Sequence, residues 1–312
     1  MAFIKTLFFA MIQIIWLLLF APLLVGVMRK VKARLQGKIG PRLLQPYYDL
    51  QKYFQKEAVF SKHSSWLTRG TPYIVFIATI ISALALPVIG KGFGTFSDVL
   101  IFIYLLAMGR IFTAFAALDT ASSFGGMGAS REMALNTVIE PAFILALVAV
   151  IIQTKTTNFS QILAVINDTT FYVSLPYFLV FAAMLFVILG ETGRIPVDNE
   201  DTHLELTMIH EGMVLEYSGR YLALMKFSSF IKQYIFITLF VILFLPFYEI
   251  KMTGFLSGLL AIGLITIKVF LVGIFISIVE VMYAKVRIYQ VPKLFVTSMT
   301  LSFLAIVVHL LF

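Results

Sequence analysis

Cysteine is absent from this sequence of 312 residues. Without thiolates the chain can form no disulfide, and it cannot hold an iron–sulfur cluster or a zinc ion through cysteine. Of the four histidines only His309 lies in an apolar segment, which argues against a haem held by two histidines between membrane spans. If the protein belongs to a redox complex, we therefore expect the redox centres to lie on other chains.

Charged residues are also scarce, at 13% of the sequence, whereas 60% of the residues are hydrophobic. Soluble domains carry about 25% charged and about 45–50% apolar residues. These proportions exclude a soluble enzyme, a disordered chain and a nucleic-acid-binding domain, and they predict an all-α polytopic membrane protein. The net charge of +8 then mostly sets the orientation in the membrane.

Eight apolar segments are long enough to cross a bilayer as helices, which need about 20 residues each. No strand-like alternation appears in them, and a lone lipid-facing strand would leave its backbone groups unpaired. The predicted spans are residues 6–28, 71–89, 99–118, 133–152, 173–190, 227–247, 255–281 and 294–312. They form a single membrane domain over residues 1–312, and we expect 153–170 to be a plain solvated connector.

A basic cluster at residues 29–34 follows the first span. That span is too long for a cleaved signal peptide, and no small-residue cleavage site precedes the cluster. If the cluster lies inside, the inside loops 29–70, 119–132, 191–226 and 282–293 hold 17 Lys and Arg, against 4 in the outside segments. This asymmetry predicts a multi-pass protein of the cell (inner) membrane with both termini outside.

Four charged residues fall within the predicted spans at positions that suggest a role: Arg110, Glu140, Lys268 and Glu280. A charge at the bilayer centre costs at least ~2.5–3.5 kcal/mol, so such residues are normally hidden, paired or functional. Glu140 precedes Pro141, which predicts a local helix break and a wet site for proton exchange. A simple ion pair with another span is the alternative for Glu140.

The other three charges have narrower roles. Lys268 lies midway through its span and needs a carboxylate partner, with which it forms either a proton relay or a static ion pair. Arg110 stays protonated and is expected to anchor a carboxylate. Glu280 lies near the inside end of its span, where it is either functional or an interfacial residue whose side chain reaches toward water.

The inside loop 191–226 contains an acidic block, although inside loops normally favour Lys and Arg. Its acidic residues are Glu191, Asp198, Glu200, Asp201, Glu205, Glu211 and Glu216. Because apolar residues alternate with them, we expect a re-entrant or interfacial helix, and a solvated acidic face is the alternative. Clustered carboxylates repel one another, which raises some of their pKa values and lets a proton be shared.

Two further patterns suggest ligands but favour simpler roles. His203 and His210 could share a helix face, yet no other residues have the spacing of a metal site, so we favour ordinary polar contacts. The glycine-rich stretch FGGMGASRE at 124–132 lacks the preceding strand and the GKS or GKT ending of a phosphate loop. We expect it to let the backbone approach a neighbouring segment closely.

Four motifs in a fixed order carry a resemblance to a known family. They are GKIGPRLLQPYYDLQK, LDTASSFGGMGASRE, ETGRIPVD and EYSG, spread along nearly the whole chain. Together they resemble the membrane H subunit of respiratory complex I (NADH dehydrogenase subunit 1) and its relatives in energy-converting membrane-bound NiFe hydrogenases. The hydrogenase and formate hydrogenlyase branch fits better, on the second motif and the residues around Glu280. Two departures are His203, where the family usually has a glutamate, and a short insertion before EYSG.

The resemblance implies a membrane subunit that anchors a peripheral arm and couples its redox chemistry to ion movement. Such a subunit binds no cofactor or metal itself, and the iron–sulfur clusters and the NiFe centre are expected on partner subunits. The implied partners are the hydrogenase large and small subunits, an iron–sulfur subunit, antiporter-like membrane subunits and the lipid bilayer, and not nucleic acid. The alternatives are the quinone-site subunit of an NADH or ferredoxin dehydrogenase and a stand-alone cation/proton antiporter.

The resemblance and the charges within the predicted spans together suggest two sets of site residues. The proton path comprises Glu140, Glu191, Asp198, Asp201, Glu205, Glu216, Arg110, Asp119, Lys268 and Glu280. The interface to the peripheral arm lies in the inside loops 29–70 and 191–226 and comprises Gly40, Pro41, Arg42, Gln45, Pro46, Asp49, Lys52 and Arg194.

Overall fold

The structure is a computed structural model of the chain. It describes residues 2–61, 64–88, 97–166, 174–195, 197–198, 209–245, 255–284 and 286–311. Within these residues the secondary structure is helical, apart from one isolated β-bridge between Asp98 and Asn158. The predicted all-α fold is therefore confirmed.

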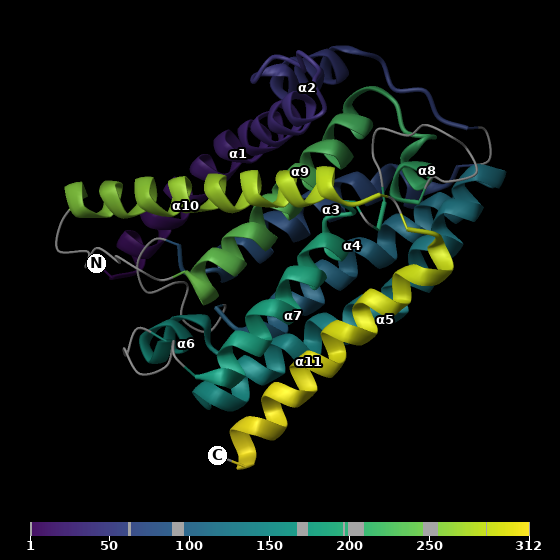
Figure 1. Cartoon of the computed structure of the whole chain (residues 1–312). Coiled ribbons are helices and arrows are strands. Elements are labelled where there is room, and N and C mark those ends of the chain that lie inside the picture. The colour runs from purple at the N-terminus through teal and green to yellow at the C-terminus, as the bar shows by residue number, and fades with distance from the viewer. Residues whose placement is uncertain are drawn as a thin grey trace.

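Long apolar helices make up most of the molecule (Figure 1). They are α1 (Ala2–Leu35), α3 (Trp66–Ala85), α4 (Val99–Asp119), α5 (Ser123–Thr154), α7 (Leu175–Glu191), α9 (Gly219–Phe244), α10 (Phe255–Met282) and α11 (Val291–Leu311). By length and composition, 7 of the described helices can cross a membrane, and α7 is a shorter apolar helix of 17 residues. The arrangement agrees with the eight predicted spans, with α7 as the short one.

Short helices lie at both ends of the bundle. Figure 1 places α2 (Gln45–Gln55) and α8 (His210–Val214) at one end, and α6 (Phe159–Ile166) with both chain termini toward the other. A short 3₁₀ helix, η2 (Ile288–Gln290), precedes α11. The expectation of a plain connector at 153–170 is wrong for α6, because Phe159, Ile162 and Ile166 are buried against the bundle.

Helix α9 is the centre of the bundle. It packs against α1, α2, α3, α7 and α10, and nearly all of its residues from Phe230 to Phe244 are buried. A helix that is apolar on every side is stable only when neighbours or lipid surround it completely. Lys232 lies within this buried stretch and its side chain is 23% exposed, whereas Arg220, in the first turn of the helix, is exposed.

Helix α5 begins earlier than the sequence suggests. The glycine-rich stretch forms its first turns, and the Ser122 side chain caps its start by accepting a hydrogen bond from the Gly125 N–H. A Cβ added at Gly128 would lie 3.0 Å from the Ile209 carbonyl oxygen and the Met213 nitrogen. This confirms the expected close backbone approach, and it identifies the neighbour as α8 and the residue before it.

Candidate functional site

Arg110 of α4 joins a carboxylate predicted within a span to one predicted at the start of the acidic inside loop. Its guanidinium lies 2.6 Å from Glu140 of α5 and 2.5 Å from Glu191 at the end of α7. Lys232 of α9 approaches the second oxygen of Glu191 at 3.1 Å. We call these four residues the Arg110 cluster.

The Arg110 cluster is balanced in charge and largely closed to solvent. Two cations face two carboxylates, and the side chains of Glu191 and Arg110 are 1% and 9% exposed. Burying an unpaired charge in a protein costs on the order of several kcal/mol. Pairing between the two cations and the two carboxylates is what makes their burial possible. Glu140 differs from Glu191, because its side chain is 36% exposed.

Helix α5 continues through Pro141 without interruption. The expected helix break beside Glu140 is therefore wrong. A proline removes one backbone donor and crowds the preceding turn, but neighbouring helices hold such helices together in a membrane. The accessibility of Glu140 comes instead from its place on the exposed side of the cluster.

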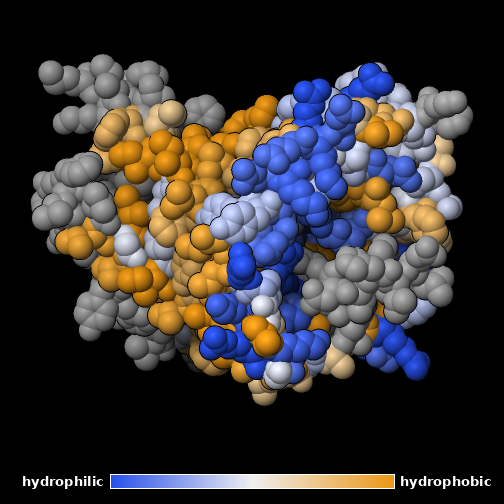
Figure 2. Space-filling model, turned by 90° about the horizontal axis from the view of Figure 1, so that it is seen from above, coloured by the Kyte–Doolittle hydropathy of each residue, from blue (hydrophilic) through white to orange (hydrophobic). Residues whose placement is uncertain are grey.

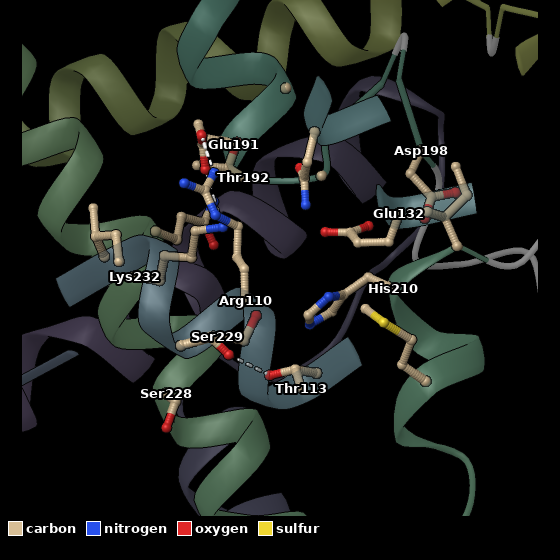
Figure 3. A pocket seen from close by; sticks show the side chains of 18 of the residues that line it. Arg110, Thr113, Glu132, Glu191, Thr192, Asp198, His210, Ser228, Ser229 and Lys232 are labelled. Carbon is tan, nitrogen blue, oxygen red and sulfur yellow. Dashed lines mark hydrogen bonds and ion pairs between the residues drawn. The ribbon is translucent and has the colours of Figure 1, made fainter. Parts of the chain in front are cut away.

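A cavity opens beside the Arg110 cluster (Figure 3). Residues of α3, α4, α5, α7, α8 and α9 line it, and it holds about 1150 Å³ of space including its opening to solvent. Figure 3 shows Glu132, His210 and Asp198 on the side of this space opposite Lys232. The Nδ2 atom of Asn136, another lining residue, is buried and has no hydrogen-bond partner within the described part of the chain.

Besides Glu191, the acidic loop contributes Asp198 and Glu211 to the cavity wall. Asp198 is 7% exposed and lines the wall, and Glu211 of α8 lines it too while pairing with Lys226 of α9. Glu216 lies half-buried in the turn before α9. The predicted path residues Asp201 and Glu205 lie outside the described residues, as does His203. Within the described residues, the re-entrant or interfacial helix predicted for this loop corresponds only to the short helix α8.

A second group of buried charges lies near the Arg110 cluster. Glu280 of α10 is 3.6 Å from Lys32 of α1 and 3.7 Å from Arg194, which follows α7. Arg194 also donates a hydrogen bond to Gln233 of α9 at 2.8 Å. Glu280 is 3% exposed, so it does not reach toward water at the interface.

Two of the predicted path residues lie in other surroundings. Lys268 donates a hydrogen bond of 2.8 Å to the carbonyl of Leu245, the residue that ends α9, within a mostly apolar pocket between α7, α9 and α10. Asp119 accepts hydrogen bonds from the backbone of Ser65 and from the backbone and hydroxyl of Thr68. Asp119 therefore caps the start of α3, and a carboxylate is favourable there because of the helix dipole.

The predicted interface residues mostly lie around α2. Arg42 and Lys52 are exposed, and Gln45 donates a hydrogen bond of 3.0 Å to Asp49. Gly40 and Pro41 precede the helix. This end of the molecule carries a broad hydrophilic region beside a hydrophobic one (Figure 2). Pro46 does not fit a surface role, since it packs inward.

Arg194 is the other exception among the predicted interface residues. It is 3% exposed and its guanidinium points to Gln233 and Glu280. A buried guanidinium cannot contact a peripheral subunit directly, so this assignment is wrong. The signal that misled was its position in an inside loop, where charged residues are usually solvated.

The EYSG motif fastens the chain after α2 to the chain before α9. The hydroxyl of Ser218 accepts a hydrogen bond from the Val59 N–H (2.7 Å) and donates one to the Val59 carbonyl (3.0 Å). A Cβ at Gly219, where φ is +54°, would lie 2.5 Å from the carbonyl oxygen of Lys56. Tyr217 donates a further hydrogen bond of 3.0 Å to the carbonyl of Thr68. The Ser218 side chain and the lack of a Cβ at Gly219 thus allow the two chain segments to pack closely together.

Some site residues were not assigned a role from the sequence. Lys232 was recognisable only as a charge within the span 227–247, and Gln233 and Glu132 carried no signal of their own. His210 was considered as a metal ligand, and it lies in the cavity wall beside Glu132 (Figure 3).

The fold and the site define a class: a multi-pass helical membrane protein with a buried, charge-balanced cluster beside a cavity. Comparison with known proteins gives the family. The chain matches the family described as NADH dehydrogenase over residues 8–310. It therefore belongs to the NADH dehydrogenase subunit 1 family, and the resemblance seen in the four motifs is confirmed.

Two curated relatives come from Escherichia coli strain K12. Formate hydrogenlyase subunit 4 is 33% identical over 302 residues, which cover 96% of this chain and 97% of the relative. Hydrogenase-4 component C is 34% identical over 283 residues, which cover 89% and 88%. Among solved structures, a chain of the membrane-bound sulfane sulfur reductase, an archaeal respiratory membrane complex, aligns with a TM-score of 0.81 at 20% identity and covers 97% of this chain and 99% of its own. That likeness supports the fold.

Proposed function

We propose that this chain is the membrane subunit of a hydrogenase-type complex and couples electron transfer in a peripheral arm to ion movement across the cell membrane. The observation that carries this proposal is Arg110, a buried cation shared by Glu140 and Glu191 beside a cavity. The names of the two bacterial relatives support the type of complex. Their high coverage of this chain supports the same part in the assembly.

A shared cation makes the two carboxylates depend on each other. Arginine does not lose its proton in proteins. A proton that the cluster takes up therefore binds to a carboxylate, and a proton that it gives up leaves from a protonated carboxyl group or from Lys232. When Glu140 takes up a proton, Arg110 loses one of its two anionic partners and its attraction shifts to Glu191. Each pKa unit of such coupling corresponds to about 1.4 kcal/mol.

The cavity supplies a route between this cluster and the inside surface. Asp198, Glu132 and His210 lie on the wall opposite Lys232 (Figure 3), and these side chains can accept or release protons. The orphaned amide of Asn136 in the same wall is suited to bind water. We propose that water in this cavity carries protons between these groups, with Asp201, Glu205 and Glu216 at the inside end.

The exposed surface of α2 and residues 37–44 is the proposed docking site for the peripheral arm. The EYSG junction connects this surface to α8, because Ser218 and Gly219 hold the chain that follows α2 and Val214 ends α8. A change in the arm can therefore act on the cavity wall through few backbone contacts. In this arrangement α2 and α8 face the inside and both termini lie outside.

The proposed partners follow from the chemistry that this chain lacks. With no cysteine it holds no thiolate for an iron–sulfur cluster, so these clusters and the NiFe centre belong to partner subunits. We propose hydrogenase large and small subunits and an iron–sulfur subunit on the inside, and antiporter-like subunits beside this chain in the bilayer.

The test is purification of the tagged chain from its native membranes in mild detergent. We expect co-purification of a nickel-containing large subunit with two CxxC pairs, and hydrogen evolution from a reduced low-potential donor. Inverted vesicles should take up protons or sodium ions during that reaction. Quinone-dependent activity blocked by quinone-site inhibitors would instead indicate a dehydrogenase, and ion exchange by the purified chain alone would indicate an antiporter.

A further inference from the structure

The second buried charge group differs from the Arg110 cluster in its surroundings. Lys32, Arg194 and Glu280 have side chains that are 9%, 4% and 2% exposed. None of these three is among the described residues that line the cavity. A carboxyl group that exchanges protons needs contact with water or another carrier, and the surroundings of Glu280 within the described chain are two cations.

Helix α9 and the turn after α7 connect the two groups. Adjacent residues of α9 reach one group each: Lys232 approaches Glu191, and Gln233 accepts a hydrogen bond from Arg194. Glu191 and Arg194 stand at the two ends of the turn that follows α7. The turn is therefore held on one side by the Arg110 cluster and on the other by Glu280.

The contacts of Glu280 with Lys32 and Arg194 are ion pairs without a hydrogen bond. Its distances of 3.6 Å to Lys32 and 3.7 Å to Arg194 exceed the usual hydrogen-bond range. A carboxylate at this separation balances both cations without fixing their geometry. If the carboxylate becomes neutral, both cations lose the anion that they share, and the one on the turn is the easier to displace.

We propose that Glu280 is a positioning residue that holds Arg194, and through Arg194 the turn that keeps Glu191 against Arg110 and Lys232. This inference rests on the proposed function of Glu191, and it gives Glu280 a role other than carrying protons. It also explains why charges on α1 and α10 bear on a site built by α4, α5, α7 and α9. The role depends on charge balance, so removing one cation should compensate for losing the carboxylate.

The absence of cysteine makes the turn directly observable. Thr192→Cys places a single thiol of this chain in the cavity wall, where a charged maleimide can label it in the intact complex. Glu280→Gln in this background should raise the labelling rate about tenfold, within the range of coupling between contacting residues. Lys32→Met together with Glu280→Gln should restore the original rate, and Lys32→Met alone should leave it unchanged.

Matched controls lie at the opposite end of the bundle. Asp98→Asn and Lys155→Met make the same chemical changes near the outside, where Asn still caps α4, and neither should alter the labelling. Glu280→Asp keeps the charge and should change the rate by less than Glu280→Gln does. If Glu280→Gln alone prevents assembly, the double variant with Lys32→Met should still assemble and be labelled at the original rate, and failure of the double variant to assemble would contradict the inference.

Two results would overturn the inference. One is unchanged labelling in Glu280→Gln together with loss of ion uptake, which would make Glu280 a proton carrier. The other is failure of the double variant to restore labelling. The labelling rate does not depend on ion transport. Absence of ion uptake in the parent complex would therefore refute the proposed function, and the labelling rate would still test whether Glu280 positions the turn.

Discussion

Removal of Arg110 should reveal how strongly the two carboxylates depend on it. Arg110→Met leaves Glu140 and Glu191 without their shared cation, and breaking a buried ion pair from one side costs about 3–5 kcal/mol. Glu191 keeps Lys232 at 3.1 Å. Part of the loss is therefore repulsion between uncompensated carboxylates, which a second substitution to glutamine should relieve.

The structure ranks the two couplings. The side chain of Glu191 is 1% exposed and that of Glu140 is 36% exposed, so the protein encloses the Arg110–Glu191 pair more completely than the Arg110–Glu140 pair. Coupling energies between contacting residues span about 0.5–3 kcal/mol. We expect the cycle of Arg110→Met with Glu191→Gln near the upper end of that range, and the cycle with Glu140→Gln near its lower end.

The assay is unfolding of the purified chain in mixed micelles with increasing SDS, read as loss of helix. A control cycle of Arg110→Met with Asp98→Asn should be additive within about 0.3–0.5 kcal/mol, because Asp98 lies at the far end of α4. Equal coupling energies for Glu140 and Glu191 would refute the ranking. A coupling below about 0.5 kcal/mol for Glu191 would refute the shared-cation geometry itself.

Three further predictions concern the surroundings of the site. Gly128→Ala should destabilise the packing of α5 on α8 by about 1–3 kcal/mol, as overpacking does, whereas Gly126→Ala, which meets nothing within 4 Å, should be neutral or stabilising by SDS unfolding. Asp119→Ala should cost about 1 kcal/mol by loss of the α3 cap, and Asp119→Asn less, in the same assay. Burial raises the pKa of Tyr217, so the folded protein keeps this proton at pH values where the unfolded chain loses it; stability should fall above about pH 10, and Tyr217→Phe should reduce that slope in a pH series.

The sequence was sufficient for the spans and for the charges within them. Long apolar runs without alternation permit only helices in a bilayer, and Arg110 and Glu140 stand out because lipid excludes charge. Glu191 stood out for a different reason, as part of an acidic block in an inside loop. The pairing of these residues was not predictable, since it depends on which faces of α4, α5 and α7 meet. A single sequence gives the length of each helix but not its rotation against its neighbours.

The errors have the same physical origin. Arg194 was assigned to the surface because it follows a span, but the turn after α7 folds inward and places its guanidinium beside Gln233. Pro141 suggested a break, yet packing from neighbouring helices keeps α5 continuous. Lys232 belongs to the site because α9 is the central helix, a property that depends on all of its neighbours at once.

The central claim is that the Arg110 cluster couples redox chemistry to ion movement, and the most direct measurement is the number of ions taken up per hydrogen evolved in inverted vesicles. Glu140→Gln and Glu191→Gln should each lower this ratio, because a glutamine side chain can neither take up nor release a proton. The complex should still assemble, and hydrogen evolution from an artificial donor to the peripheral arm should persist. Asp98→Asn should behave as the parent does. An unchanged ratio in both glutamine variants would contradict the account.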